Sequence, residues 1–404
     1  MLYNKDKNMK KKSLFFAIII ALAFVFCMSM ATCPLEKQGN NTPETEPEPE
    51  LELTVLENED ISPGESAADF VAKVKIGWNL GNTLDAHPGG ETSWGNPLTT
   101  RAMITAIKEN GFNTIRIPVS WYHRAPKSGN YAINSDFMNR VKEVVDYAVE
   151  NNLYIILNTH HDEEIFKFMD KDMDESKKAF EAVWRQIAET FKDYDYKLVF
   201  EGLNEPRTKG SDREWQGGTA EERKNLNEMH QIFVDTVRAS GGNNGKRILM
   251  ISTYAASVEP AAVNGLTLPV DTEENSGVNK FIVSVHSYSP YNFALNEGTG
   301  AVKAWSASIS SDTRDITGWI DRVYTKFVSN GIPVIGGEFG ALNRNNEDDR
   351  AAWAEFYVSE AGKRGIKCIW WDDGGNFRLF NRASRQFYFP KIHAALMRGA
   401  GVAK

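Results

Sequence analysis

Cysteine is scarce in this sequence, because its 404 residues include only Cys27, Cys33 and Cys368. The first two lie in an N-terminal leader, so the folded part keeps one cysteine and we expect no internal disulfide. Cys368 sits in the apolar run KCIWW, where a buried structural thiol is expected. A basic surplus is lacking too, because the formal net charge is −8. Since a phosphate backbone needs a basic surface, this charge argues against a nucleic-acid partner.

The N-terminal apolar run is too short for a comfortable membrane span of about 20 residues. This run, LFFAIIIALAFVFC, follows a cluster of lysines and precedes smaller residues, an order typical of an export signal. We therefore assign residues 1–33 to a leader, with an uncleaved anchor as the alternative. The stretch Met30-Ala31-Thr32-Cys33 resembles a bacterial lipobox, in which Cys33 becomes the lipidated first residue. Ordinary signal-peptidase cleavage nearby is the other interpretation.

Residues 34–66 contain almost nothing that could be buried. The segment EKQGNNTPETEPEPELE is rich in Pro, Glu and Thr, a composition typical of a solvated, extended tether. This order, with a lipid first, then a stalk and then a domain, is typical of a protein held at a cell surface. We therefore expect an exported monomer, extracellular or attached to the outer membrane only through a lipid on Cys33.

Internal repeats of 20–50 residues and glycine-rich dinucleotide fingerprints are both absent. The chain instead alternates apolar runs with stretches in which apolar residues recur every three to four positions. Near-continuous apolar runs are typical of parallel strands that are buried on both faces. The expected strands are residues 75–80, 113–119, 153–159, 197–203, 247–253, 281–287, 333–339 and 367–373.

Helical patterns such as RAMITAIKENG, FMNRVKEVVDYAVENN and KKAFEAVWRQIAETF separate these runs. Eight strands, each followed by a helix, predict an α/β fold, namely a single (β/α)8 TIM barrel over residues 67–404. A doubly wound open sheet is the structural alternative, although no dinucleotide fingerprint follows the first strand to support it.

Reactive residues of such a barrel gather where its strands end. Polar residues embedded in apolar runs are costly unless they are paired or functional, so those at the expected strand ends form the candidate site. The evidence for this site is that several expected strands share polar residues at their ends, since any single case would be weak. The residues are Asn79, Asn82, Arg116, His160, His161, Asn204, Glu205, His286, Tyr288, Glu338, Trp370 and Trp371.

Two glutamates on the fourth and seventh strands are expected to face each other across the barrel mouth. Glu205 lies between Asn204 and Pro206, and Glu338 lies within Gly-Gly-Glu-Phe-Gly. These small neighbours leave backbone room for a ligand. Retaining glycosidases need two carboxyl groups about 5–5.5 Å apart, since one attacks the anomeric carbon while the other protonates the leaving oxygen. The pattern predicts Glu338 as the nucleophile and Glu205 as the acid/base.

The residues around this pair fit supporting roles. Arg116 can hold Glu338 ionised by charge pairing, and Tyr288 can donate a hydrogen bond to the same carboxylate. Asn204 is placed to bond a sugar 2-hydroxyl, a contact that strengthens in an oxocarbenium-like transition state. His286 can orient Glu205.

The run His160-His161-Asp162 invites a metal interpretation. Adjacent histidines on a strand point to opposite sides, however, and so rarely bind one ion. We expect neither a metal nor a cofactor. His160 is instead expected to bond a sugar hydroxyl, and His161 to be packed or structural.

Taken together, the motifs resemble glycoside hydrolase family 5, the cellulase family of the retaining (β/α)8 clan. The shared segments run in the family's order from about residue 75 to 375: GWNLGNTLDA, SWGNP, NTIRIPVSW, LNTHHD, FEGLNEP, VHSYSPYNF, GGEFGA and WWDDG. The combination of GNTLDA, ETSWGNP and WWDDG is most similar to subfamily 4, which includes endo-β-1,4-glucanases, xyloglucanases and mixed-linkage glucanases.

The resemblance implies particular roles. Trp371, rather than Trp370, is the expected glucosyl platform, and Trp94 is expected to line a glycone subsite. Asp373 stands where the family has an asparagine, which puts that contact in doubt. The family pattern as a whole falls on Arg116, His160, Asn204, Glu205, His286, Tyr288, Glu338 and Trp371.

The implied activity is that of an endo-acting, retaining β-1,4-glucanase, with cellulose, xyloglucan or mixed-linkage glucan as the polysaccharide partner. One alternative is a β-mannanase, which shares the two-glutamate plan. The other is a surface glycan-binding protein that kept the barrel and lost catalysis. Such a protein would lack a glutamate, asparagine or arginine of the pattern, and none is missing here.

Overall fold

The computed structural model describes residues 58–275 and 277–402. Eight parallel strands form a closed barrel in chain order, and β1 pairs with both β2 and β8. The predicted (β/α)8 fold is therefore confirmed. The strands are β1 (Gly77–Leu80), β2 (Thr114–Ile117), β3 (Tyr154–Asn158), β4 (Leu198–Glu201), β5 (Leu249–Ser257), β6 (Phe281–His286), β7 (Val334–Phe339) and β8 (Lys367–Asp372).

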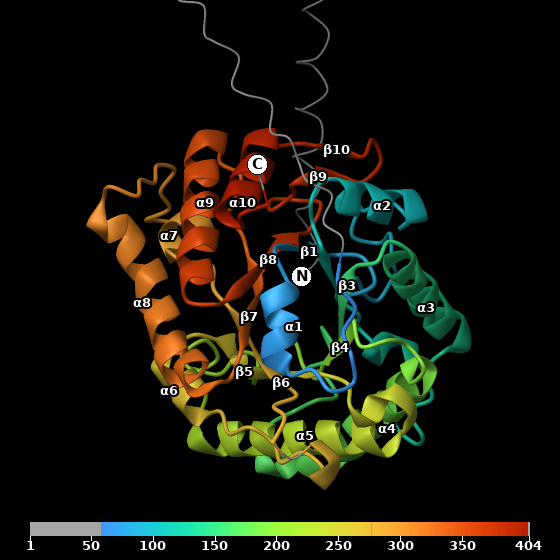
Figure 1. The fold of residues 1–404 in the computed structure, drawn as a ribbon. Helices are drawn as coiled ribbons and strands as arrows, with labels where there is room; N and C mark the ends of the chain where they lie inside the picture. Colours follow the sequence, from blue (N-terminus) through green and yellow to red (C-terminus); the bar gives the residue numbers. More distant parts are fainter. Residues whose placement is uncertain (1–57, 276, 403–404) are drawn as a thin grey trace, which may run out of the picture. The chain divides into compact units, whose positions relative to one another are not determined.

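Helices surround the barrel and follow the strands along the chain (Figure 1). They are α2 (Arg101–Glu109), α3 (Ser135–Glu150), α4 (Met173–Phe191), α5 (Ala220–Ala239), α6 (Pro260–Gly265), α7 (Tyr291–Ala294), α8 (Ser310–Lys326), α9 (Glu347–Lys363) and α10 (Pro390–Gly399). Short 3-10 turns are η1 (Tyr122–Arg124), η2 (Asp170–Asp172), η3 (Gly242–Gly245), η4 (Glu273–Asn275) and η5 (Val328–Asn330). Side-chain caps begin several helices; at α5, Thr219 and Glu222 form a reciprocal capping box.

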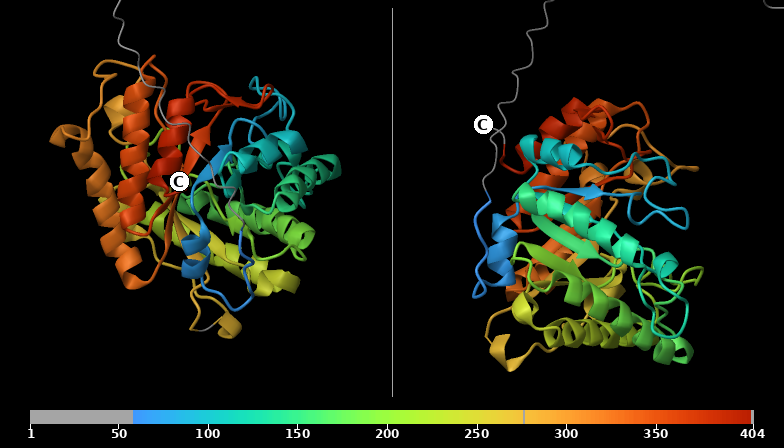
Figure 2. Two further views of the ribbon diagram at one scale, coloured as in Figure 1. Left: turned by 45° about the horizontal axis from the view of Figure 1, so that its top comes forward. Right: turned by 90° about the vertical axis from the view of Figure 1, so that its right-hand side faces the viewer.

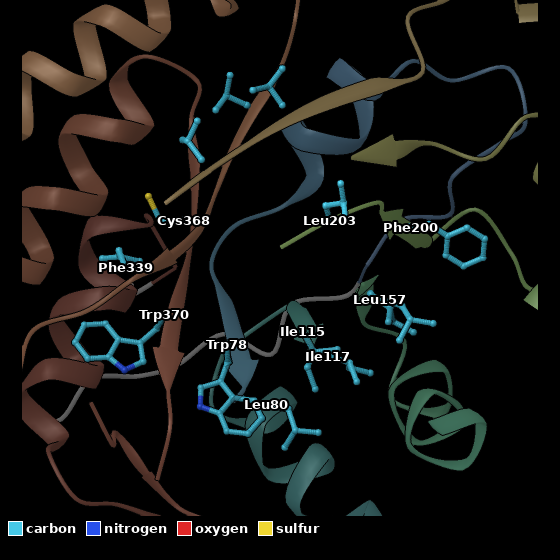
Figure 3. Packing of buried hydrophobic residues seen from close by; sticks show 14 of the residues in the cluster. Trp78, Leu80, Ile115, Ile117, Leu157, Phe200, Leu203, Phe339, Cys368 and Trp370 are labelled. Atoms are coloured by element: carbon cyan, nitrogen blue, oxygen red, sulfur yellow. The ribbon is translucent and has the colours of Figure 1, made fainter. Parts of the chain in front are cut away.

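Strand side chains alternate between two cores, because successive residues of a strand point to opposite faces. One set packs between the barrel and the helices; Figure 3 shows Trp78, Ile115, Leu157 and Trp370 among its members. Cys368 belongs to it as well, and burial raises the pKa of its thiol to about 12, so the expectation of a buried thiol is confirmed.

The other set fills the interior of the barrel and is covered by a helix that the sequence patterns did not predict. This helix, α1 (Ala67–Lys73), packs Phe70 and Val71 against inward-facing strand residues. Figure 1 looks onto the end that α1 covers. The inward-facing strand residues of this core are Tyr154, Ile156, Val199, Met250, Ile282, Ile335 and Ile369.

Contacts with the barrel begin before the expected domain start at residue 67. Asn58 donates a hydrogen bond to the Asn113 carbonyl at 3.1 Å, and Ile61 is buried against the α1 core. Residues 58–66 therefore belong to the folded part rather than to the tether. The leader and residues 34–57 of the tether lie outside the described residues.

The candidate site lies at the end of the barrel opposite α1. In the right-hand view of Figure 2, α1 lies at one end and the loop that follows β1 projects from the other. After β8, the short strands β9 (Phe380–Asn381) and β10 (Gln386–Phe387) pair with each other as a separate two-stranded antiparallel sheet. None of the helices within the described ranges is long and apolar enough to cross a membrane.

Candidate active site

Glu338 is the penultimate residue of the barrel strand β7 and is held by two donors. Arg116 on β2 donates from Nη1 to Glu338 Oε1 at 2.8 Å, and the Tyr288 hydroxyl donates to Oε2 at 2.9 Å. The glycine before Glu338 is needed for packing, because a Cβ at Gly337 would lie 2.9 Å from Nε2 of His286. Gly337 of the Gly-Gly-Glu-Phe-Gly motif thus makes room for His286.

Glu205 follows β4 and faces Glu338. Nδ1 of His286 lies 2.9 Å from Glu205 Oε1 and 3.7 Å from Glu338 Oε2. One oxygen of each glutamate and one nitrogen of His286 all lie within 4.8 Å of one another. This separation suits the direct attack of a retaining glycosidase, for which the carboxyl groups stand about 5–5.5 Å apart.

The donors to Glu338 keep their protons throughout the physiological range. Burial opposes the charge of Arg116, but the charges of Glu201 and Glu338 outweigh it and raise the pKa of Arg116. Burial, reinforced by the charge of Glu338, also raises the pKa of Tyr288 well above its ordinary value. Both groups therefore donate to Glu338, and their two hydrogen bonds favour its ionised form.

The two glutamates titrate as a coupled pair. Burial raises the pKa of Glu338 in the free protein. Burial acts on Glu205 in the same sense, but the hydrogen bond and charge of His286 outweigh it and lower the pKa of Glu205. These pKa directions run opposite to an acid role for Glu205, so that role rests on geometry: Arg116 and Tyr288 already occupy both oxygens of Glu338, and Glu205 is the carboxyl with an oxygen left to carry a proton to a ligand.

Asn204 and Asn79 both touch the same arginine. Nη2 of Arg116 donates to Asn204 Oδ1 at 2.6 Å, and Nη1 donates to Asn79 Oδ1 at 3.0 Å. The Asn204 oxygen is thus committed, which leaves its amide NH2 to donate to a sugar hydroxyl. Asn79 is fully buried and also donates to the Gly337 carbonyl at 2.9 Å, so it supports the site from below.

The two tryptophans of β8 have different surroundings. Trp371 lies parallel to the His160 ring, with 5.7 Å between the ring centroids and 5° between the planes. Gly81 leaves space for it, since a Cβ there would lie 2.8 Å from the Trp371 ring. Trp370 is fully buried and donates from Nε1 to the Phe377 carbonyl at 3.1 Å. Trp371 is therefore the tryptophan that faces the other site residues.

Trp94 lies in the loop after β1 and is 40% exposed. Its Nε1 donates to the His87 carbonyl at 3.1 Å, and its ring centroid lies 5.8 Å from that of His161. The structure thus places an exposed indole next to the histidines that follow β3, at the same end of the barrel as the glutamates.

Comparison with known proteins adds to this geometry. A family model described as Cellulase (glycosyl hydrolase family 5) matches residues 80–376. This chain belongs to glycosyl hydrolase family 5. It is 44% identical over 353 residues to Endoglucanase B of Neocallimastix patriciarum, a match that covers 83% of this chain and 72% of the relative.

Two solved structures are similar over nearly their whole length to this family 5 chain. A GH5-4 broad specificity endoglucanase from Clostridium acetobutylicum has 45% identity and a TM-score of 0.77, covering 82% of this chain and 99% of the other. A second, from Ruminococcus champanellensis with bound cellotriose, has 42% identity and a TM-score of 0.79, covering 85% and 100%. The resemblance to subfamily 4 is confirmed, and this family 5 chain is an endo-acting β-glucanase.

The expected direction of the paired histidines in this family 5 enzyme is wrong. Strand β3 ends at Asn158, so His160 and His161 lie in the following loop, where strand alternation no longer applies. Their Nε2 atoms lie 4.0 and 3.8 Å from the same Asp85 oxygen. Burial lowers the pKa of His161 to about 4 and that of His160 well below its ordinary value, so both rings are neutral.

This close grouping does not make His160 a good metal ligand. The Asn158 amide lies with Nδ2 3.2 Å from His160 Nδ1, and its Oδ1 accepts the Val119 amide at 3.1 Å. Nδ1 of His160 is therefore an acceptor, and the neutral ring carries its proton on Nε2. A metal at Nε2 would have to displace that proton. That the family 5 enzyme works without a metal stays a prediction.

Reading strand ends alone missed two buried carboxylates of the family 5 site, Glu201 and Asp85. Asp85 accepts the amides of Asn82 and Thr83 and so closes the loop after β1. Burial raises the pKa of Asp85 to about 7. Glu201 is the last residue of β4, four residues before Glu205, and contacts Arg116 at 2.7 Å. The available signal was a charged residue within the apolar run KLVFEGL.

Proposed function

We propose that this endo-β-glucanase cleaves internal β-1,4 bonds with retention of configuration, with Glu338 as the nucleophile and Glu205 as the acid/base. The proposal rests on one observation: one oxygen of each glutamate and one nitrogen of His286 lie within 4.8 Å of one another. Their partners differ in kind, because Glu338 accepts from an arginine and a tyrosine whereas Glu205 meets a histidine.

In the first step, Glu338 forms a bond to the anomeric carbon as the bond to the leaving oxygen breaks. Glu205 gives its proton to that oxygen, so a free sugar hydroxyl departs and a glycosyl ester remains on Glu338. The amide NH2 of Asn204 donates to the 2-hydroxyl as positive charge develops on the sugar.

In the second step, Glu205 removes a proton from water, and the water oxygen attacks the same carbon. The ester bond breaks and returns its electron pair to Glu338, where Arg116 and Tyr288 stabilise the carboxylate that leaves. Two inversions at one carbon retain the β-configuration.

A β-glucan is the polysaccharide we assign to this site. Support comes from the parallel faces of Trp371 and His160, from the exposed Trp94, and from the cellotriose bound by the Ruminococcus champanellensis relative. Asp373, which stands where the family has an asparagine, makes its hydrogen bonds within the chain: its Oδ1 accepts the amides of Gly375 and Phe377. That side chain therefore shapes the loop after β8.

The decisive test is the configuration of the first product, followed by NMR with a cello-oligosaccharide. We expect the β-hemiacetal to appear first and the α-form only by later mutarotation. An α-configured first product would mean inversion and would refute the role of Glu338. Comparing initial rates on carboxymethylcellulose, tamarind xyloglucan, lichenan and glucomannan would rank the substrates and test the β-mannanase alternative.

Two alanine variants separate the roles of the glutamates. Glu338→Ala should abolish retaining turnover on every substrate. Glu205→Ala should still form the glycosyl-enzyme from aryl glycosides with good leaving groups, since these barely need protonation. Added azide should then release a β-glycosyl azide from Glu205→Ala. The opposite pattern of rescue would exchange the two assignments.

We also propose that the protein is exported and held at the cell surface by a lipid on Cys33. The support is the order of the sequence: a lysine-rich start, an apolar run, a lipobox-like stretch and a Pro/Glu/Thr-rich tether. All of these lie outside the described residues.

A further inference from the structure

Glu201 is a fully buried carboxylate beneath the catalytic pair, with its side chain 0% exposed. It accepts hydrogen bonds from Arg116 Nε at 2.7 Å, from Asn158 Nδ2 at 3.0 Å and from Ser284 Oγ at 2.7 Å. These donors come from β2, β3 and β6, while Glu201 itself ends β4. A buried charge is costly, and here three donors from three other strands offset that cost.

Through Arg116, Glu201 is linked to Glu338. The planar guanidinium of Arg116 donates from Nε to Glu201 and from Nη1 to Glu338 at 2.8 Å. The position of Glu201 therefore fixes the direction from which the guanidinium approaches Glu338. The two glutamates also share its single positive charge. The other titratable groups that face Glu338 are Tyr288, His286 and Glu205, and Arg207 lies beyond, 3.5 Å from Glu205.

Through Asn158, Glu201 is linked to His160. The Asn158 amide nitrogen carries two hydrogens, and the carboxylate of Glu201 and Nδ1 of His160 lie 3.0 and 3.2 Å from it. Because the amide oxygen accepts from Val119, the side chain cannot turn over without losing all three contacts. Glu201 therefore fixes the orientation that keeps the His160 proton on Nε2.

We propose that Glu201 is a positioning residue that weakens the hold of Arg116 on the nucleophile and fixes the tautomer of His160. The inference rests on the proposed role of Glu338. Glu201 touches no substrate, so it acts on the reaction only through these two neighbours. Its negative charge keeps Glu338 more basic, and thus a stronger nucleophile, than a lone arginine partner would allow.

The test variant is Glu201→Gln, which can keep every contact. Its amide oxygen can accept from Arg116 and Asn158, and its NH2 can donate to the Ser284 hydroxyl, which is able to accept. The variant then differs from the wild type by one charge. Without that charge, Arg116 acts on Glu338 alone and lowers the pKa of Glu338.

The readout is the pH profile of kcat/KM on an aryl β-cellobioside with a poor leaving group. This rate rises with the ionised fraction of the nucleophile, so a lower pKa moves the acidic limb to lower pH, by about one unit for the loss of one close charge. At the plateau kcat should fall about threefold or more, because nucleophilicity falls with basicity. KM should stay unchanged, and thermal unfolding verifies the fold.

Glu222→Gln is the matched control. Glu222 is also buried, and it accepts from the Tyr254 hydroxyl at 2.8 Å and the Thr219 amide at 2.7 Å. Its variant should keep the wild-type pH profile. If the acidic limb does not move in Glu201→Gln, the inference is overturned, whether or not kcat falls. A merely structural role of Glu201 would lower the rate equally at all pH values.

Two further variants keep the result interpretable. Glu338→Gln separates the two proposals. If this variant remains active, the proposed function fails. If it is inactive and the acidic limb of Glu201→Gln does not move, only the present inference fails. If Glu201→Gln does not fold, Ser284→Ala replaces it. Without the Ser284 donor, Glu201 interacts more strongly with Arg116, and Arg116 then stabilises the ionised form of Glu338 less. The pKa of Glu338 should rise, so the acidic limb should move to higher pH. An unmoved limb there overturns the inference.

Discussion

At the scale of single residues, the neighbours Trp370 and Trp371 illustrate how one strand serves two layers. Trp370 is fully buried and packs against Phe339 and Trp353 outside the barrel. Trp371 points the other way, toward His160. The same residue type therefore packs outside the barrel at one position and faces the candidate site at the next.

Alanine substitution should separate these two duties. Trp371→Ala should lose about 1–3 kcal/mol of transition-state binding and keep nearly the wild-type melting temperature. Trp370→Ala leaves a cavity and should lose about 3–5 kcal/mol of the free energy of unfolding. Measuring kcat/KM on cello-oligosaccharides beside urea unfolding tests both. A folded, inactive Trp370→Ala with a fully active Trp371→Ala would reverse the assignment.

His230 makes stability depend on pH. It is fully buried on α5, with Nε2 2.8 Å from the Ser252 carbonyl, and burial lowers its pKa to about 4. Below the ordinary pKa of 6.5 the unfolded chain binds a proton that the folded protein excludes until about pH 4. Stability is therefore fully present above pH 6.5 and is lost as the pH falls through this window.

His230→Gln should remove that loss, because glutamine does not titrate and its NH2 can donate to the same carbonyl. The free energy of unfolding of the wild type should fall by about 2 kcal/mol more than that of the variant between pH 7 and pH 4.5. Urea unfolding at both pH values measures this difference, and the pH 7 value corrects for any packing cost. Equal losses in both proteins would contradict the assignment.

The sequence patterns located the residues at or just after the expected strand ends, but not Glu201, which lies deeper in the barrel. Glu205 and Glu338 could be found because an acidic residue beside Asn-Pro or Gly-Gly stands out at the end of an apolar run. Glu201 lies within its run, where only the side-chain direction tells a site residue from a core residue. The opposite directions expected for His160 and His161 were wrong because β3 ends at Asn158, and strand ends are not fixed by residue type alone.

At the scale of elements, Arg247 joins parts of the barrel's surroundings that are distant in sequence. It is fully buried just before β5 and donates to the carbonyls of Phe191, Tyr194, Asp195 and Leu198. Its guanidinium also lies 4.9 Å from the centroid of the Phe200 ring. One side chain thus ties the end of α4 to the start of β4, the strand that leads to Glu205.

Arg247→Met should therefore be costly, because it removes the donor to four carbonyls, and the hydrogen bonds to those of Phe191 and Leu198 are buried. We expect a loss of about 3–5 kcal/mol in the free energy of unfolding, with kcat of the folded fraction close to wild type. Urea unfolding and active-site titration measure these quantities. Arg185→Met is a suitable control, since Arg185 is 65% exposed in a surface ion pair with Glu181 and should change stability by less than about 0.5 kcal/mol. Similar effects of the two variants would refute the role of Arg247.

The eight strands were predictable because each is a near-continuous apolar run, and the observed strands all lie within or close to the expected ranges. The helix α1 and residues 58–66 were not. The α1 segment AADFVAK is short, and residues 58–66 are mostly polar. The role of Ile61, Phe70 and Val71 is therefore clear only from the barrel end that they cover.

At the scale of the whole molecule, the proposed lipid on Cys33 has a direct test. Cys33→Ala should move the protein from the membrane fraction to the soluble exported fraction while leaving its rate on lichenan unchanged, because the cysteine lies far along the chain from the barrel. Fractionation with an antibody, beside activity on the same fractions, measures this. An unchanged membrane fraction would favour an uncleaved anchor instead.

The pairing of β1 with β8 sets a condition on how the protein comes into being. Asn79 lies beside Trp371 in that pair, although almost the whole domain separates them along the chain. A growing polypeptide therefore contains Arg116, Glu205 and Glu338 well before it contains the strand that completes the ring. Hydrolysis has to wait for the last strand, so the first appearance of activity during synthesis reports the moment at which the two ends of the sheet meet.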